Sequence, residues 1–305
     1  MKKHVITYIA GVPNVKNLEK IEVLQRFAGG VLKCGDNGIA SKQTSWTPSD
    51  LGVIQGFVHE ASPKSKHLML RKSVVEHQKR IGKNSLIIDS NLFLYADKLN
   101  PLHYLRYSLN GVFPTTGNYF DSIVDSNRWK QISTDYNISL KDWRTNGDHI
   151  LICVQRNNGW SMQGKNVVKW LDSTVKQLRK YTDRPIVVRG HPGDKSAKQY
   201  LNIKSDQWKL SKNENLTDDF KNAWAVITYN SSPGVAAAIE GIPLFVTDPY
   251  PQVSQAHAVA NLQLSQIENP KVFERLQWIE KICMSHWKFE ELNNGSAWMH
   301  IRKYI

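Results

Sequence analysis

Two adjacent serines stand where the chain changes from an expected strand to an expected helix. The strand covers residues 225–229, Ser231 and Ser232 form the turn, and Pro233 begins the helix. Proline suits this position because its missing N–H costs nothing in the first turn, and either serine is a candidate N-cap. Such a helix start offers free N–H groups and the positive end of the helix dipole. These residues therefore predict a cradle for an anion such as a phosphate.

Glu240 stands at the far end of the same expected helix. Gly241 follows it and favours the end of the helix, and Pro243 prevents its continuation. Glu240 lies about two helical turns beyond the serines, where a carboxylate is suited to bind a diol. The segment therefore predicts a nucleotide site, with the phosphate at the serines and the ribose at Glu240.

Arg189 and His191 follow another expected strand, at residues 185–189. Both side chains donate hydrogen bonds to phosphate oxygens. The segment is equally compatible with an ordinary turn, because the His-Pro and Gly-Asp steps that follow Gly190 are common turn residues. In a parallel sheet, however, ligands bind outside the carboxyl ends of the strands. Together with the serine pair, Arg189 and His191 favour one shared ligand site.

A glycine-containing loop follows the strand expected at residues 149–154. It contains Arg156 and Gly159, which we expect to approach a diphosphate. The loop is not the G-x-G-x-x-G motif of dinucleotide-binding dehydrogenases, and the sequence has no P-loop. It also lacks H-E-x-x-H, G-x-S-x-G and paired C-x-x-C motifs. These absences argue against dehydrogenases, P-loop NTPases, zinc hydrolases and serine hydrolases.

Strand-like and helix-like segments alternate along the chain. Expected strands are short apolar runs at residues 5–10, 30–33, 51–58, 86–95, 149–154, 185–189, 225–229 and 244–246. The longest expected helices cover residues 63–82 and 165–181, the second with an apolar stripe opposite its lysines. This alternation predicts βαβ units in doubly wound parallel sheets.

The polar segment 126–148 has weak periodicity and is the best candidate for a linker. We therefore expect an α/β protein with two Rossmann-like domains facing a cleft, at residues 1–145 and 146–268. Residues 269–305 form a tryptophan-rich segment that we expect to be helical and to pack back on the first domain.

The His-Pro motif at His191, the serine pair and the E-G-x-P motif at Glu240 resemble GT-B fold glycosyltransferases. The resemblance covers about residues 149–250 and is strongest to relatives of bacterial sialyltransferases and of capsule or Kdo transferases. It implies that His191, Ser231, Ser232 and Glu240 bind a nucleotide-sugar donor, without a metal ion or other cofactor. The sequence departs from the sialyltransferases in lacking their acidic D/E-D/E-G motif, which counts against a sialic acid donor.

Sugar transfer with inversion needs a base that takes the proton of the acceptor hydroxyl. We expect this base in the first domain, where Asp89 and His59 are the candidates. Asp89 interrupts an apolar strand, and an unpaired buried carboxylate is costly. It therefore either caps a turn or faces the cleft as the base. His59 is equally compatible with an ordinary loop residue.

Candidate acceptor-binding residues also lie in the first domain. Lys64, Arg71 and Lys72 belong to an expected basic helix, and Arg106 and Asn118 to polar, aromatic segments that follow it. A basic helix face is often only solvated. The alternative is that these side chains contact the phosphates of a nucleic acid.

The sequence carries a net charge of +13 at pH 7 and has an isoelectric point near 9.5. Such an excess favours a polyanionic partner. We therefore expect the acceptor to be DNA that carries a hydroxymethylated pyrimidine, as in bacteriophage DNA modification. The first alternative is a capsule or lipopolysaccharide transferase that docks on anionic lipid. The second is a non-catalytic, nucleic-acid-binding protein on a transferase scaffold.

The expected compartment is the cytoplasm, which for a phage protein is that of the host. The three cysteines, Cys34, Cys153 and Cys283, are far apart and odd in number, as is typical of reduced proteins. No apolar run reaches the length of a membrane span, and the N-terminal residues resemble a first strand rather than a signal peptide.

Overall fold

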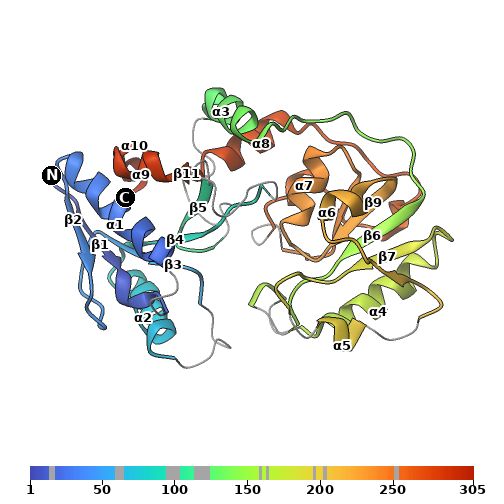
Figure 1. The fold of residues 1–305 in the computed structure, drawn as a ribbon, viewed down its shortest axis with the longest axis horizontal. Helices are drawn as coiled ribbons and strands as arrows, with labels where there is room; N and C mark the ends of the chain where they lie inside the picture. The colour runs from blue at the N-terminus through green and yellow to red at the C-terminus, as the bar shows by residue number, and fades with distance from the viewer. Residues whose placement is uncertain are drawn as a thin grey trace. The chain divides into compact units, whose positions relative to one another are not determined.

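Two β-sheets organise the chain (Figure 1). The computed structural model describes residues 1–13, 18–58, 65–93, 104–112, 124–157, 160–162, 165–194, 197–201, 205–250 and 254–305. These residues form two units, each with its own sheet. The first unit consists of Met1–Asn91, Tyr95–Tyr136 and Glu280–Ile305, and the second of Leu92–Leu94 and Asn137–Ile279. The predicted α/β class with two Rossmann-like domains is confirmed.

The first unit contains a six-stranded sheet in the order β11-β5-β4-β3-β1-β2. Its strands are β1 (His4–Tyr8), β2 (Asn37–Ser41), β3 (Leu51–Gln55), β4 (Asn84–Ser90), β5 (Tyr104–Leu109) and β11 (His286–Lys288). The first four are parallel, whereas β5 and β11 add to one edge in antiparallel directions. The chain order reverses between β1 and β3, and such a switch point is where open α/β sheets bind ligands.

Helix α1 (Leu18–Lys33) replaces the strand predicted at residues 30–33. The prediction was wrong because a short apolar run fits a buried strand and a buried helix equally well. In the helix, Gly30 allows the close approach of α9 (Phe289–Asn293), since a Cβ at this position would lie 2.0 Å from the carbonyl oxygen of Leu292. The adjacent strand is instead β2, which the apolar pattern did not reveal because only part of it is buried.

The C-terminal residues complete the core of the first unit, as predicted. They form β11, α9, α10 (Ser296–Ile301) and a final 3₁₀ turn (Arg302–Tyr304). Trp298 is fully buried in this core and donates from Nε1 to Asp36 at 2.8 Å. Arg302 donates to the same carboxylate at 2.6 Å. The tail is thus part of the first unit, although it contributes a strand as well as helices.

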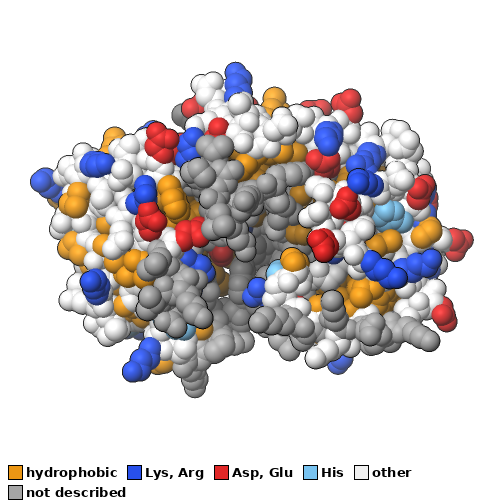
Figure 2. Space-filling view, in the orientation of Figure 1, with side chains coloured by type: hydrophobic (Ala, Val, Ile, Leu, Met, Phe, Trp, Pro, Cys, Tyr) orange, Lys and Arg blue, Asp and Glu red, His pale blue; other side chains and the backbone are white. Residues whose placement is uncertain are grey.

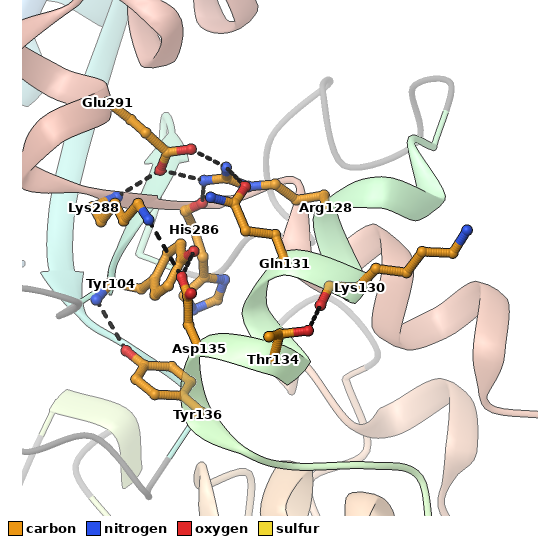
Figure 3. Close-up of polar contacts among 10 residues, drawn as sticks. All are labelled: Tyr104, Arg128, Lys130, Gln131, Thr134, Asp135, Tyr136, His286, Lys288 and Glu291. Carbon is orange, nitrogen blue, oxygen red and sulfur yellow. Dashed lines mark hydrogen bonds and ion pairs between the residues drawn. The ribbon is translucent and has the colours of Figure 1, made fainter.

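Helix α3 (Ser126–Tyr136) occupies the first part of the segment predicted to be a linker. Figure 3 shows how its polar residues meet the tail. The buried Arg128 donates to Glu291 at 2.8 Å and to the carbonyl oxygen of His286, and its guanidinium lies 4.0 Å from the ring centre of Trp287. The weak periodicity arose because α3 buries a charged residue, for which the apolar pattern has no signal.

The second unit contains a five-stranded parallel sheet in the order β10-β9-β6-β7-β8. Its strands are β6 (His149–Cys153), β7 (Ile186–Arg189), β8 (Lys209–Leu210), β9 (Ala223–Thr228) and β10 (Leu244–Val246). This is the Rossmann order 3-2-1-4-5, with β6 as its first strand. Its switch point therefore lies between β6 and β9.

The helices of the second unit are α4 (Val167–Leu178), α5 (Ala197–Leu201), α6 (Leu216–Phe220) and α7 (Pro233–Ile239). In α4 the predicted apolar stripe is buried, and the Asn166 side chain caps the helix by accepting from two backbone N–H groups. α7 follows the predicted turn and ends at Gly241, whose φ of 69° favours glycine. A last helix, α8 (Leu276–Cys283), carries the chain from the second unit back to the first.

Candidate functional site

The switch point of the second sheet carries two buried amides that bind each other. Gln155 follows β6, and Asn230 follows β9. Gln155 Nε2 donates to Asn230 Oδ1 at 2.8 Å, and the backbone N–H of Asn230 donates to Gln155 Oε1 at 3.1 Å. These two bonds hold the ends of β6 and β9 together at the switch point.

A buried carboxylate extends this pair to a third strand end. Asp248 follows β10, is fully buried, and accepts a hydrogen bond of 2.6 Å from Asn230 Nδ2. The same nitrogen donates to the carbonyl oxygen of Ser161 at 2.9 Å. These bonds use both hydrogens of the amide. The loops after β6, β9 and β10 are thus held in one arrangement, which we call the Gln155–Asn230–Asp248 cluster.

His191 follows β7 and presents a defined tautomer. The backbone N–H of Gly193 donates to His191 Nδ1 at 3.0 Å, so the hydrogen of the neutral ring lies on Nε2. Burial lowers the pKa of His191, and the nearby charge of Arg156 lowers it further. At neutral pH the ring is therefore an uncharged donor whose Nε2–H has a fixed direction.

Arg156 lies beside this histidine. A Cβ at Gly193 would approach a terminal nitrogen of Arg156 to 2.2 Å, so the glycine makes room for the guanidinium. Asp194 holds the two loops together, because it accepts from the backbone N–H of Asn157 at 3.1 Å and from the Tyr200 hydroxyl at 2.5 Å. A cation and a neutral N–H donor therefore lie next to each other, as phosphate recognition requires.

The serine pair lies where it was predicted, but the predicted N-cap bond is not made. Ser232 is the N-cap residue of α7 and has no side-chain capping hydrogen bond. Ser231 Oγ is buried and hydrogen-bonds to none of the described residues. Because α7 has only seven residues, its dipole is small, and because it begins with proline, it has one free N–H group fewer. The serine pair therefore offers neither a capping bond nor an accessible Ser231 hydroxyl in this structure.

Two other predicted donor residues have partners within the second unit. Glu240 is the C-cap residue of α7, about 12 to 13 Å along the helix from the serines, and forms an ion pair with Lys141 at 2.5 Å. Arg189 pairs with Asp219 and donates to the carbonyl oxygens of residues 213–215. These contacts give Arg189 a structural role in holding that loop.

Lys165 is a residue of the site that the sequence patterns did not reveal. Its Nζ donates to the Tyr229 hydroxyl at 2.6 Å and lies 4.7 Å from the centre of the same ring. The hydrogen bond to Tyr229 raises the pKa of Lys165. Tyr229 directly follows β9, so the lysine adds a second cation to the edge of the sheet that carries Arg156.

The Gln155–Asn230–Asp248 cluster was also missed, although a signal was present. Each member is a polar residue one or two positions after an apolar strand. Amides and carboxylates at the carboxyl ends of neighbouring parallel strands are brought together by the sheet. Their pairing could not be read from the sequence, because it depends on which strands are neighbours.

The predicted residues of the first unit are only partly described by the structure. His59, Lys64 and Asn118 lie outside the described residues, as does Gly159 of the second unit. Asp89 is near the end of β4, accepts from the backbone N–H of Ser90 at 2.7 Å, and lies 3.6 Å from Arg106. The Asp89 carboxylate therefore makes both a turn contact with Ser90 and an ion pair with Arg106.

The basic residues predicted on the helix occupy different positions of α2 (Lys66–Arg80). Lys72 pairs with Glu76 at 3.6 Å on a solvated face. Arg71 is buried and donates from Nε to the carbonyl oxygen of Gly11 at 2.6 Å. Only part of the predicted basic face is therefore exposed.

Two solved structures resemble the whole chain. One is KpsC, a beta Kdo 2,4 transferase from Thermosulfurimonas dismutans, with a TM-score of 0.55 and 13% identity over 93% of this chain and 90% of that one. The other is a beta Kdo 2,7 transferase of KpsC from the same organism, with a TM-score of 0.51 and 14% identity over 97% and 99% of the two chains. No family model and no curated protein matches the sequence. The similarity shows that the chain has the GT-B fold.

Two features are absent from the described residues. No group of three or more His, Cys, Asp or Glu side chains in them is arranged to hold a metal ion. None of the helices found there combines the length and the apolar character that a membrane span requires.

Proposed function

We propose that the protein is a glycosyltransferase that moves a sugar from a nucleotide-sugar donor to a hydroxyl acceptor. The observation that carries the proposal is the carboxyl edge of the second sheet, where Arg156, His191 and Lys165 lie beside the strand ends. Two cations and a neutral N–H donor suit a nucleotide diphosphate or monophosphate. The GT-B fold supports this role.

For the donor, we favour a nucleotide-activated acidic sugar such as Kdo, because two solved structures of similar fold are Kdo transferases. For the acceptor, we favour a capsule or lipopolysaccharide glycan on the same ground. We propose Asp89 or His59 as the base, with no metal or other cofactor. Reaction in the cytoplasm belongs to the same proposal.

Hydroxymethylated DNA is the second candidate acceptor, and the net charge of +13 favours it. On the face drawn in Figure 2, however, the Lys and Arg side chains of the described residues lie among Asp and Glu side chains. Nucleic-acid-binding surfaces usually gather their cations on one face. We therefore place this acceptor second.

One experiment tests the donor and the acceptors together. The protein is incubated with CMP-Kdo, other CMP-, UDP- and GDP-sugars, and either glycan or hydroxymethylated DNA acceptors, and products are detected by mass spectrometry. We expect transfer to a glycan with one class of donor, and the same yield when EDTA is added. Transfer only to DNA supports the second candidate. Salt-sensitive DNA binding without any transfer contradicts the enzyme and supports a nucleic-acid-binding protein.

His191→Ala tests the donor site itself. The variant loses a hydrogen bond to a charged phosphate, so we expect the nucleotide to bind about tenfold or more weakly in calorimetry. Lys176→Ala, on the exposed face of α4, is the matched control and keeps the original affinity. Equal affinity of the His191 variant and the original protein would contradict the assignment.

A further inference from the structure

Arg71 lies at the switch point of the first sheet. Gly11 follows β1 and Gly56 follows β3, and the Arg71 side chain reaches both of them from α2. Arg71 Nε donates to the carbonyl oxygen of Gly11 at 2.6 Å. A Cβ at Gly56 would lie 2.7 Å from one terminal nitrogen of Arg71, and φ at this glycine is 82°. The guanidinium therefore occupies the crevice where an open α/β sheet binds its ligand.

The terminal nitrogens of this guanidinium make no direct contact with a carboxylate of the described residues. Only 7% of Arg71 is exposed, yet these nitrogens form no hydrogen bond or ion pair with any described residue. Three other buried or nearly buried arginines differ: Arg106 pairs with Asp89, Arg128 with Glu291, and Arg189 with Asp219. The charge of Asp89 acts on Arg71 only from beyond ion-pair distance, so the terminal nitrogens of Arg71 stay open to a ligand.

A buried charge without a partner is costly, so its position needs an explanation. Burial lowers the pKa of Arg71 to about 10, and the side chain remains charged at neutral pH. Gln55, at the end of β3, adds a second unused group, because its buried Oε1 accepts no hydrogen bond from a described residue. A ligand that brings an anion would supply the direct contact that the Arg71 guanidinium lacks.

The chemistry of the crevice selects a carboxylate. With Nε bound to Gly11, the two terminal nitrogens are left, and they match the two oxygens of a carboxylate end-on. His67, one helical turn before Arg71, adds no charge at neutral pH, because burial and the charge of Arg71 lower its pKa. The negative charge of Asp89 also acts on Arg71. One cation in this setting suits a monoanion better than a doubly charged phosphate.

We propose that Arg71 binds the carboxylate of an acidic sugar, which serves as the acceptor of the reaction. That this sugar is the acceptor rests on the proposed function. The binding of its carboxylate by Arg71 does not require any transfer. Arg71 was a candidate for contacts with DNA phosphates on sequence grounds, and its buried position favours a small acidic sugar instead.

The first experiment leaves the protein unchanged and varies the ligand. The methyl glycoside of Kdo and the methyl ester of the same glycoside are titrated into the full chain by calorimetry. We expect the acid to bind at least tenfold more tightly than the ester, because only the acid carries the charge that Arg71 lacks. Equal affinities would overturn the proposal.

The second experiment locates the preference for the acid. In Arg71→Met we expect the acid and the ester to bind equally, at the affinity that the ester has for the original protein. Arg71→Lys keeps the positive charge but loses the two terminal nitrogens of the guanidinium. It should therefore keep part of the preference for the acid over the ester. Lys79→Met, on an exposed position of the same helix, should keep all of it. A full preference in Arg71→Met would overturn the proposal.

Two outcomes separate this inference from the proposed function. His191→Ala should keep the preference for the acid, because His191 belongs to the donor site. A protein that binds the acid through Arg71 but transfers no sugar would support the inference and contradict the proposed function. If a short phosphodiester oligonucleotide binds through Arg71 and the acidic sugar does not, a nucleic acid is the ligand and the inference is wrong.

Discussion

The two sheets place opposite kinds of chemistry at their switch points. In the second sheet, Gln155 and Asn230 bind each other and Asp248 completes the cluster. In the first sheet, Arg71 lies between the glycines that follow β1 and β3, and its terminal nitrogens bind no described residue. The same topological feature therefore carries a satisfied cluster in one unit and an unsatisfied cation in the other.

The difference indicates what each edge is built to do. Paired buried polar groups hold loops in one geometry, which allows His191 and Arg156 to meet a ligand without rearrangement. An unpaired buried charge instead reduces the stability of the free protein and strengthens binding of an anion. The second unit thus uses its polar groups for preorganisation, and the first uses Arg71 for recognition.

Arg128→Met should have the largest effect on stability. The substitution leaves Glu291 buried without its partner and removes one of the two ion pairs between α3 and the tail, the other being Asp135–Lys288. We expect the free energy of unfolding of the first unit to fall by about 3 to 5 kcal/mol. Hydrogen exchange of peptides from residues 286–305 measures this loss, with Lys79→Met as the control. A loss below about 1 kcal/mol would show that the ion pair is not what holds the tail.

Asn230→Ala should have the next largest effect, in the second unit. It leaves Gln155 and Asp248 without their common partner, each at the cost of an unsatisfied buried group. We expect a loss of about 2 to 3 kcal/mol, together with weaker nucleotide binding. Urea unfolding and calorimetry measure the two quantities, and Asn146→Ala, at an exposed position, is the control. Unchanged nucleotide affinity would show that the cluster does not organise the donor site.

Acid should destabilise the first unit through His286. Burial lowers the pKa of this histidine to about 3, whereas an unfolded chain has a histidine pKa of about 6.5. Between these values the unfolded state binds more protons, so stability falls as the pH drops from about 6.5 towards about 3. The midpoint temperature of thermal unfolding should therefore differ less between pH 7 and pH 5 in His286→Gln than in the original protein. An identical pH dependence would contradict the role of His286.

Arg71→Met should have the smallest effect on stability, and it tests the comparison most directly. The variant loses the hydrogen bond to Gly11 but also removes a buried charge that has no directly bound carboxylate among the described residues. These changes offset each other, so we expect the free energy of unfolding to stay within about 1 kcal/mol of the original value. Urea unfolding beside Arg128→Met provides the measurement. Equal losses in the two variants would mean that Arg71 is paired in solution.

Local patterns predicted much of the second unit. The stripe of α4, the strand β9 and the turn into α7 are each encoded within about 15 residues, so propensity and periodicity were sufficient. The first unit was harder, because β5 and β11 pair with partners far away in the chain. Its residues 30–33 were predicted as a strand and belong to α1, since packing against α9 decides their conformation.

The residues of the candidate site also divide into those that local patterns predicted and those that depend on distant partners. His191, Arg156 and the serine pair were predicted because each is a suitable residue type at an expected strand end. The partners of Glu240 and Arg189 were not predicted, because Lys141 and Asp219 come from other segments. Arg71 was predicted to bind the acceptor on the ground of a basic helix, whereas its burial between two glycines is visible only in the fold.

The sequence by itself determined the α/β class, the strand ends that carry polar residues and the type of chemistry they offer, because these features depend on short-range patterns. Only the tertiary structure decided which polar groups satisfy one another. That decision depends on strand order and packing, which bring Gln155 to Asn230 and leave the terminal nitrogens of Arg71 without a hydrogen bond to any described residue. Burial then sets the energetic consequence, because the same hydrogen bond or charge matters far more away from water.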